Sequence, residues 1–253
     1  MLGLWWRFAM SQITLRPVSP EARPCKICKS AAELCGQVDF NRSCEELRGF
    51  RLPPLGIAVH YRRCSSCGFL FTECLDDWTQ ADFKQHIYND DYARIDPDYA
   101  HNRPGINASN IARQFYPDRE RLRILDYGGG NGYLADLLRS TGFAHVETYD
   151  PFTPEFSRRP ESQFDLITSY ETFEHLPDPG PVFEEIADML APGGTVQFST
   201  LVLPSRYDMT WWYIGPRNGH VSIFSERALA IAWQQHGFGV RSSSPDLHVA
   251  RRG

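Results

Sequence analysis

The sequence predicts an α/β protein whose main domain is a mostly parallel sheet, preceded by a small metal-binding β module. Two observations lead to this fold class. A strand, a glycine turn and a helix follow one another near the middle of the chain, and two C-x-x-C pairs lie in its first third. With 253 residues and 42% hydrophobic content, the chain can form one α/β domain and one small module.

The most informative motif is Asp-Tyr-Gly-Gly-Gly-Asn-Gly at 126–132, between an apolar run and an apolar helical pattern. Its glycines at alternate positions favour a turn with positive φ that lets the backbone approach a ligand closely. A chance glycine cluster in a surface loop is the alternative, but the flanking strand and helix disfavour it. A dinucleotide fingerprint needs a further glycine at position 133, where the chain has Tyr133.

Three further segments continue the alternation of strands and helices. Residues 145–150 predict a strand ending in Asp150, about twenty residues past the glycine turn, where a carboxylate can accept both ribose hydroxyls. Residues 164–169 predict the next strand, and a Leu-Ala-Pro-Gly-Gly turn at 190–194 leads into another at 195–200. Ligands bind beyond the carboxyl ends of strands in open α/β sheets, so these loops should meet at one crevice.

The glycine motif resembles motif I of the class I methyltransferases that use S-adenosylmethionine (SAM). Glu-His-Leu-Pro-Asp-Pro at 174–179, the turn at 190–194 and His-Val-Ser-Ile-Phe-Ser at 220–225 are similar to later segments of that family. The resemblance implies a Rossmann-like sheet with an antiparallel C-terminal strand, and SAM as cofactor. It implies cofactor-binding roles for Asp126, Gly128, Gly130, Gly132, Asp150, Tyr170 and Glu171.

One segment departs from the family pattern. The family places a helix and a third strand after the second acidic strand end, but residues 151–163 carry three prolines. We therefore predict that the sheet is truncated at its third-strand edge. Downstream, Ser225 should cap a helix that runs to Gln235, and residues 238–240 and 247–249 should pair as closing antiparallel strands.

The loop at 211–222 is rich in aromatic residues and carries Arg217 and His220. Such a loop at the strand ends would wall an acceptor pocket, with Arg217 as an anchor for an anionic group. A packed structural turn is the alternative interpretation. His175 and His220 are the candidates for a catalytic base, because imidazole takes up a proton near neutral pH. For His175 the alternative is a structural role in its loop.

The second strong signal is a pair of C-x-x-C motifs, formed by Cys25, Cys28, Cys64 and Cys67. Four thiolates in tetrahedral geometry favour a structural Zn²⁺ ion, and residues 58–61 and 69–71 should form a hairpin around the second pair. Disulfides or unrelated thiols are the alternatives. We expect that the apolar N-terminal stretch is not a signal peptide, which disfavours disulfides.

These features divide the chain into four expected parts: a disordered tail at 1–20, a zinc-ribbon-like module at 21–75, a helical or loop lid and linker at 76–118, and the SAM-binding domain at 119–253. The segment at 76–118 is either a lid over the cofactor or a solvated connector. A net charge of −5 disfavours a general nucleic-acid binder. No apolar run is long enough to span a membrane, and we expect a cytoplasmic protein.

The sequence thus predicts a SAM-dependent methyltransferase that acts on a small molecule by direct methyl displacement. The layout is similar to that of small-molecule and sugar C-methyltransferases, so a sugar or secondary metabolite is one acceptor class. One rival is a non-catalytic SAM-fold protein that binds a partner through its zinc module. An RNA or protein methyltransferase is another. The sequence does not indicate the acceptor atom or the oligomeric state.

Overall fold

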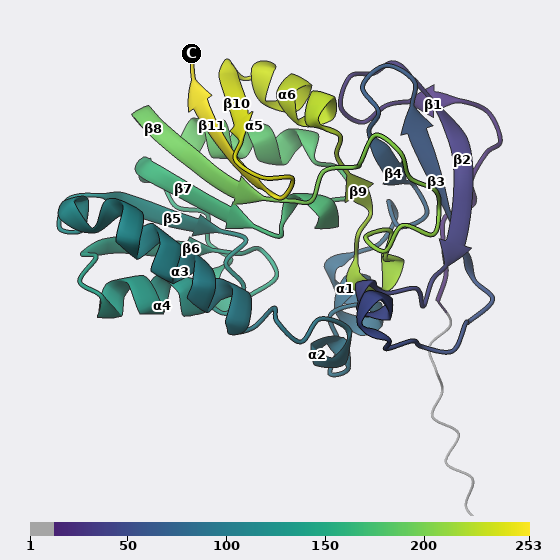
Figure 1. The fold of residues 1–253 in the computed structure, drawn as a ribbon, viewed down its shortest axis with the longest axis horizontal. Helices are drawn as coiled ribbons and strands as arrows, with labels where there is room; N and C mark the ends of the chain where they lie inside the picture. Colours follow the sequence, from purple (N-terminus) through teal and green to yellow (C-terminus); the bar gives the residue numbers. More distant parts are fainter. Residues whose placement is uncertain (1–12) are drawn as a thin grey trace, which may run out of the picture.

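The computed structural model describes residues 13–253, which form two sheets joined by a helical segment (Figure 1). The larger sheet has six strands in the order β10-β11-β8-β7-β5-β6. The smaller has five, in the order β1-β2-β3-β4-β9. Among the described residues, no helix is long and apolar enough to cross a membrane.

The larger sheet confirms the predicted fold class. The four strands β8, β7, β5 and β6 run parallel, β11 pairs antiparallel with β8, and β10 pairs antiparallel with β11. The strands are β5 (Arg123–Tyr127), β6 (His145–Tyr149), β7 (Phe164–Tyr170), β8 (Leu190–Ser199), β10 (Phe238–Ser242) and β11 (Leu247–Arg252).

Strand β6 forms one edge of this sheet, as the prolines at 151–163 predicted. That segment contains only a 3-10 turn, Pro154–Phe156, before β7 begins. Proline cannot donate a ladder hydrogen bond, so the segment cannot add a third strand beyond β6.

Helices cover both faces of the larger sheet (Figure 1). Side chains of α3 and α4 pack with Ile124 on one face, and those of α5 and α6 pack with Leu125 on the other. This split follows from the strand geometry, which points successive side chains to opposite faces. The helices are α3 (Asn102–Phe115), α4 (Tyr133–Ser140), α5 (Gly180–Met189) and α6 (Glu226–Gln234), the last capped by Ser225 as predicted.

The smaller sheet is antiparallel throughout and contains the predicted hairpin. Its strands are β1 (Arg23–Pro24), β2 (Ala31–Asp39), β3 (Ala58–Cys64), β4 (Leu70–Thr72) and β9 (Ser222–Ile223). The last of these comes from the C-terminal half of the chain. Residues 21–75 therefore do not complete their own sheet, which the sequence did not indicate.

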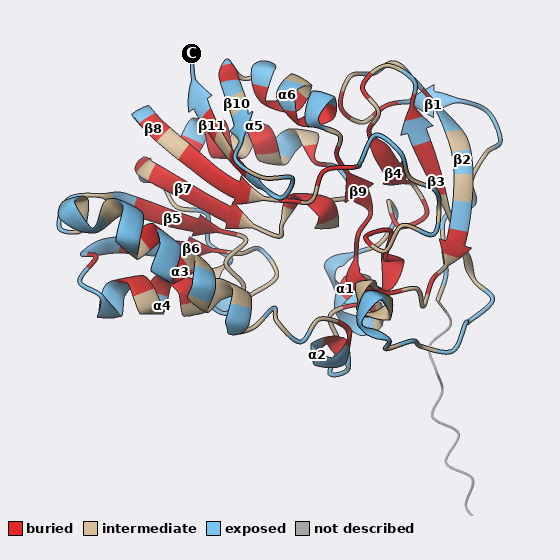
Figure 2. Cartoon of the chain, in the orientation of Figure 1, coloured by how far each residue is buried: buried red, intermediate tan, exposed pale blue. Residues whose placement is uncertain are grey.

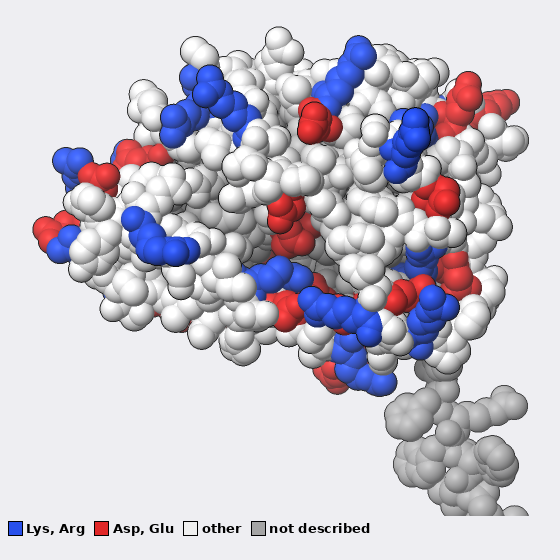
Figure 3. Space-filling model, viewed as in Figure 1, with Lys and Arg blue, Asp and Glu red and all other residues white. Residues whose placement is uncertain are grey.

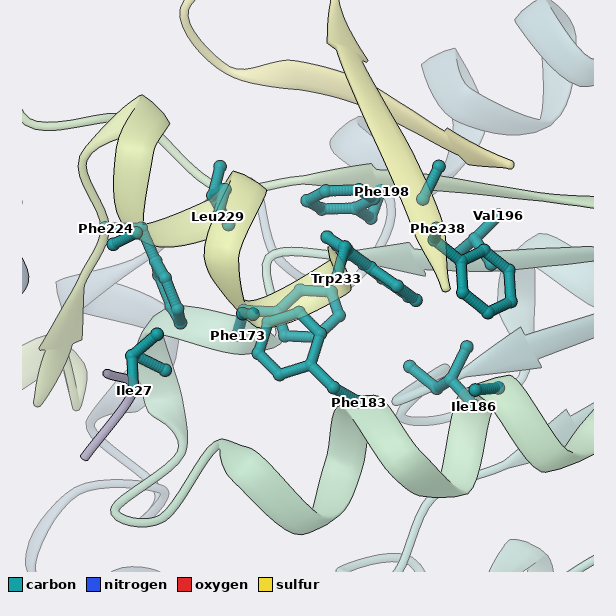
Figure 4. Packing of buried hydrophobic residues seen from close by; sticks show 14 of the residues in the cluster. Ile27, Phe173, Phe183, Ile186, Val196, Phe198, Phe224, Leu229, Trp233 and Phe238 are labelled. Carbon is teal, nitrogen blue, oxygen red and sulfur yellow. The ribbon is translucent and has the colours of Figure 1, made fainter. Parts of the chain in front are cut away.

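The two sheets also share a hydrophobic core (Figure 4). Ile27, which lies between the first two cysteines of the cluster, packs beside Phe173 and Phe224 of the larger domain. Buried residues make up most of the parallel strands of the larger sheet and all of β9 and β4 (Figure 2). The two parts are therefore joined by a continuous apolar interior.

The segment between the sheets contains two short helices, α1 (Gln80–His86) and α2 (Tyr92–Ile95), before α3. It is attached to the loop at 211–222: the Tyr92 hydroxyl donates to Asn218 O (3.2 Å), and Arg217 donates to Ile87 O (2.8 Å). The segment thus forms a packed wall, rather than a solvated connector.

The predicted disordered tail does not hold for residues 13–20. Arg16 N donates to Cys74 O (2.8 Å), and the Trp78 indole donates to Thr14 O (2.8 Å). Ile13, Leu15 and Val18 also pack against the core around the smaller sheet. The rest of the predicted tail, residues 1–12, lies outside the described residues.

Candidate cofactor and acceptor site

The glycine turn between β5 and α4 is built from backbone that side chains would obstruct. Gly128, Gly130 and Gly132 all have positive φ, at 71°, 55° and 76°. A Cβ on Gly128 would lie 2.5 Å from Thr172 Oγ1, whereas one on Gly130 would meet nothing within 4 Å. The turn is therefore packed on its first glycine and open at its middle one, as a ligand-binding turn requires.

Asp126 lies beneath this turn. Its side chain is buried, accepts a hydrogen bond from Thr168 Oγ1 (3.0 Å), and would touch a Cβ on Gly129 at 2.4 Å. Burial raises the pKa of Asp126 to about 7. In this geometry Asp126 supports the turn from the sheet side.

Asp150, directly after β6, reaches the turn from its other side. Gly130 N donates to Asp150 Oδ2 (2.9 Å), and Phe152 N donates to Oδ1 (2.8 Å). Each carboxylate oxygen has a second lone pair that these bonds leave free. The structure thus brings the second predicted acidic residue to the middle of the glycine turn.

Tyr170 and Glu171 follow at the carboxyl end of β7, but their side chains diverge. Tyr170 packs with the core under α3, and its hydroxyl donates to Gln197 Oε1 (3.4 Å). Glu171 has a positive φ of 51°, and its carboxylate accepts from Ser199 Oγ (2.7 Å). Burial and the neighbouring Glu174 raise the pKa of Glu171 to about 8.

Glu174, His175 and His220 form a compact cluster, with ligand-type atoms within 4.8 Å of one another. Tyr213 donates its hydroxyl to Glu174 Oε1 (2.7 Å), and Oε2 of the same carboxyl group is buried without a protein partner. The two imidazole rings lie 5.1 Å apart, and Tyr88 contacts His175 Nδ1 at 3.2 Å. The structure therefore brings together the two histidines that the sequence nominated.

Both histidines are neutral near pH 7, because burial lowers the pKa of His175 to about 4 and that of His220 to about 3. His220 Nδ1 lies 2.8 Å from Tyr213 O. A carbonyl oxygen can only accept, so we assign the proton to Nδ1, which leaves Nε2 with a lone pair. The neutral ring in this tautomer presents Nε2 as a hydrogen-bond acceptor.

In the loop at 211–222, the expected role of Arg217 as an anchor for an anionic acceptor is wrong. Arg217 is buried and donates to Ile87 O and to Asn89 Oδ1, so it holds the linker and is not available to an anionic acceptor. Arg103 of α3 instead faces the site: it pairs with Asp96, and its charge acts on Glu171. Figure 3 shows this face hollowed between the two lobes, with acidic side chains in the hollow and basic ones beside it.

The four cysteines of the C-x-x-C pairs converge at one point. The sulfur atoms of Cys25 and Cys67 lie 3.6 Å apart and those of Cys28 and Cys64 lie 3.4 Å apart, and all four sulfurs fall within 4.8 Å of one another. A disulfide needs a separation of about 2 Å, whereas a tetrahedral zinc–thiolate site places its sulfurs roughly 3.8 Å apart. The donor set and its spacing fit a zinc ion.

The model of the methyltransferase domain family matches residues 99–243, more than half of the chain. The chain belongs to this methyltransferase family. The match covers the glycine turn, Asp150, the Glu174 cluster and the aromatic loop, while the cysteine cluster lies outside it. The class I SAM-dependent methyltransferase resemblance and the α/β fold class are thereby confirmed.

Curated relatives of this methyltransferase domain cover only part of the chain. It is 32% identical over 103 residues to the ubiquinone biosynthesis O-methyltransferase of Paracidovorax citrulli, covering 31% of this chain and 43% of that protein. The same-named protein of Shewanella halifaxensis is 34% identical over 84 residues, covering 33% and 29%. The chain matches less than half the length of these relatives.

Among solved structures, the mitomycin 7-O-methyltransferase aligns with a TM-score of 0.50 at 14% sequence identity. The alignment covers 71% of this chain and 60% of that one. At this identity the likeness concerns the methyltransferase fold alone.

The sequence did not indicate two features of the site. These are Arg103, which pairs with Asp96, and the hydrogen bond that the Tyr213 hydroxyl donates to Glu174. The aromatic loop did signal Tyr213, but only as an apolar wall. No local pattern marks Arg103, which lies near the start of α3 in the segment expected to be a lid or linker.

Proposed function

We propose that this chain transfers the methyl group of SAM to a small-molecule acceptor by direct displacement. The observation that carries the proposal is the pairing of Asp150 with Gly130 N at the open point of the glycine turn. A carboxylate fixed there, with lone pairs still free, is suited to accept the two ribose hydroxyls of a nucleoside.

The cofactor would lie across the carboxyl ends of β5, β6 and β7, as ligands do in open α/β sheets. Asp126 supports the turn, the three glycines admit the cofactor, and Asp150 holds its ribose. Tyr170 and Glu171 end β7, the strand beside the turn. SAM supplies an activated methyl group, so the protein's tasks are alignment and the exclusion of water.

The acceptor would bind between the Glu174–His175 turn and the loop at 211–220. His220 Nε2 is the better candidate for a base, because its Nδ1 is engaged by a backbone carbonyl. Tyr88 occupies Nδ1 of His175 and orients that ring instead. The O-methyltransferase activity in the relatives' names supports an oxygen nucleophile on a small molecule.

The cysteine cluster is proposed to hold one structural zinc ion. Ile27 N and Cys67 N donate to the sulfurs of Cys25 and Cys64 (3.4 Å each), which stabilises thiolates as ligands. With four thiolates bound, zinc has no open position for chemistry.

Calorimetric titration with SAM and with its demethylated product tests the proposal directly. We expect both to bind, and SAM to yield the product when small hydroxyl-bearing acceptors are screened by mass spectrometry. Micromolar affinity would correspond to about −8 kcal/mol. If neither ligand binds at millimolar concentration, the proposal fails.

A further inference from the structure

Glu171 is held in a conformation that its residue type disfavours. Its φ of 51° is one of two positive values at non-glycine positions in the described residues, and such backbone is concentrated at functional sites. Ser199, the last residue of β8, fixes it: Glu171 N donates to Ser199 Oγ (2.9 Å) and Ser199 O (3.2 Å), while Ser199 Oγ donates to Glu171 Oε1 (2.7 Å).

This strained position borders the glycine turn. In the β5–β7 ladder Asp126 lies opposite Thr168, so the turn and Glu171 leave the sheet side by side. Thr172, the next residue, packs directly on Gly128. The backbone of Glu171 therefore lies beside the space proposed for the cofactor, and its carboxyl group is held by Ser199 at the end of β8.

Charged and titratable groups surround Glu171 on the other elements. Glu174 of the following 3-10 turn repels its negative form, and Arg103 of α3, paired with Asp96, attracts it. The negative charge of Glu171 also contributes to raising the pKa of Tyr213 and of Cys44, in the loops on the acceptor side. Burial and Glu174 dominate, so Glu171 lies close to the balance between its two forms, with a pKa of about 8.

We propose that the protonation state of Glu171 follows the charge of the bound cofactor. Glu171 is protonated when the site is empty and ionised when a sulfonium occupies it. This inference rests on the proposed function. When SAM binds, the O–H bond of Glu171 breaks, its electron pair stays on the carboxylate, and the proton leaves to solvent. After methyl transfer the C–S electrons return to sulfur, the positive charge disappears, and Glu171 takes a proton again.

The physical reason is the difference between the two cofactor forms. SAM and its product carry the same amino-acid and nucleoside groups, and only SAM carries the sulfonium charge. A positive charge within a few ångströms of a partly buried carboxyl stabilises its ionised form. The carboxylate is then present to balance the sulfonium charge only while a methyl donor is bound.

The test is proton linkage in the unmodified protein. Heats of binding are measured near pH 7 in phosphate and in Tris, whose ionisation enthalpies differ, so that their difference counts the protons released. Binding of SAM should release nearly one proton more than binding of the demethylated product. Glu171→Gln should abolish this difference while both ligands still bind, and Glu147→Gln, at an exposed acid of β6, should leave it unchanged.

Affinity gives the second readout. Below the free-state pKa of Glu171, each unit rise in pH should strengthen SAM binding by up to tenfold relative to the product. Ser199→Ala retains Glu171 but removes the hydroxyl that favours its ionised form, so it should shift this pH dependence upward. Ser199→Ala provides the test of the proposal if Glu171→Gln does not fold.

The outcomes separate the two proposals. If neither ligand binds, the proposed function fails and the inference falls with it. If both bind and release equal numbers of protons, the inference alone is overturned. A SAM-specific release that persists in Glu171→Gln also overturns it and assigns the proton to another group, with Asp126, whose pKa is also raised by burial, as one candidate.

Discussion

Asp126 and Asp150 end neighbouring strands and contact the same glycine turn, yet their surroundings differ. Asp126 is sealed under the turn with one hydroxyl donor, whereas Asp150 is half-buried and shared between two backbone N–H groups. A sealed carboxyl is destabilised in its charged form, whereas the Asp150 carboxyl group keeps lone pairs free for a ligand. Mutation of Asp150 should therefore change ligand affinity, and mutation of Asp126 should change the stability of the fold.

Asp150→Ala should weaken SAM binding at least tenfold and leave the fold intact. Hydrogen bonds to a charged group contribute roughly 1.5–3 kcal/mol each, and the substitution removes the proposed acceptor of two hydroxyls. Calorimetry measures the affinity, and circular dichroism checks the fold. Glu147→Ala, an exposed acid on the same strand pair, is the control. Unchanged SAM affinity in folded Asp150→Ala would place the ribose contact elsewhere.

Asp126→Asn should become progressively more stable than the parent protein as pH rises. The folded-state pKa of about 7 lies above the unfolded value, so stability from the neutral carboxyl is complete at low pH and is lost as pH rises toward 7. Asparagine cannot ionise and keeps an oxygen for Thr168. Urea unfolding at about pH 5 and about pH 8 measures the difference. A pH-independent difference would mean that Asp126 is ionised in its buried position.

His220→Ala should lower turnover by 10²–10⁴-fold with little change in SAM affinity, which is the effect of removing a base. His175→Ala should lower turnover less, because Tyr88 occupies its Nδ1. Turnover and SAM binding are measured separately, with His145→Ala, an exposed histidine of β6, as control. Loss of SAM binding alone in both variants would assign the histidines to the cofactor.

At the scale of elements, the short strand β9 links the two parts of the molecule. Its two residues pair with Leu70 and Phe71 of β4. Ser222 and the residue before it also bond to the segment after β7: Val221 N donates to Glu174 O, and Ser222 Oγ donates to Leu176 O. A short strand thus fixes the acceptor-side loop between the cysteine module and the turn that carries Glu174 and His175.

Cys64→Ser should remove about one zinc per chain and expose two separate segments to protease. Residues 21–75 should become sensitive because metal binding supplies their folding free energy. Residues 211–223 should follow because β4 is their partner. SAM affinity should fall as well, because the cysteine module and the methyltransferase domain share one buried core. Cys35→Ser, at an exposed cysteine outside the cluster, should change neither protease pattern nor zinc content. Protection of 211–223 in metal-free protein would contradict the coupling.

Local patterns in the sequence were enough to predict several elements. Three prolines predicted the missing edge strand, and Ser225 predicted the start of α6. Both effects are local, because each residue restricts or caps the backbone in its immediate neighbourhood. The pairing of β9 with β4 joins residues about 150 positions apart, and no local signal records it. Arg217 was misassigned for the same reason, since its burial depends on the distant Ile87 and Asn89.

For the molecule as a whole, the apolar core is the main connection. Ile27 of the cysteine module, Phe173 after β7 and Trp233 of α6 belong to one buried cluster. Such a cluster loses its packing on every side when any one part opens. The methyltransferase domain and the cysteine module should therefore behave as one cooperative unit.

Unfolding in urea should show one transition, with tryptophan fluorescence, circular dichroism and release of zinc to a chelating dye changing together. Coincident transitions by independent probes are the sign of a two-state process. Release of zinc well before the loss of helical signal would show that the module opens alone. Added SAM should move all three curves by the same amount, because it stabilises the only folded state.

The late origin of β9 has a consequence for biosynthesis. When residue 75 has left the ribosome, all four cysteines of the cluster are available, but the edge of β4 has no partner until residues 222–223 emerge, roughly 150 residues later. At about 5–20 residues per second, that edge stays open for roughly 7–30 s. An unpaired strand edge recruits strands from other chains. The nascent protein is therefore most prone to aggregation in the interval before its C-terminal half arrives.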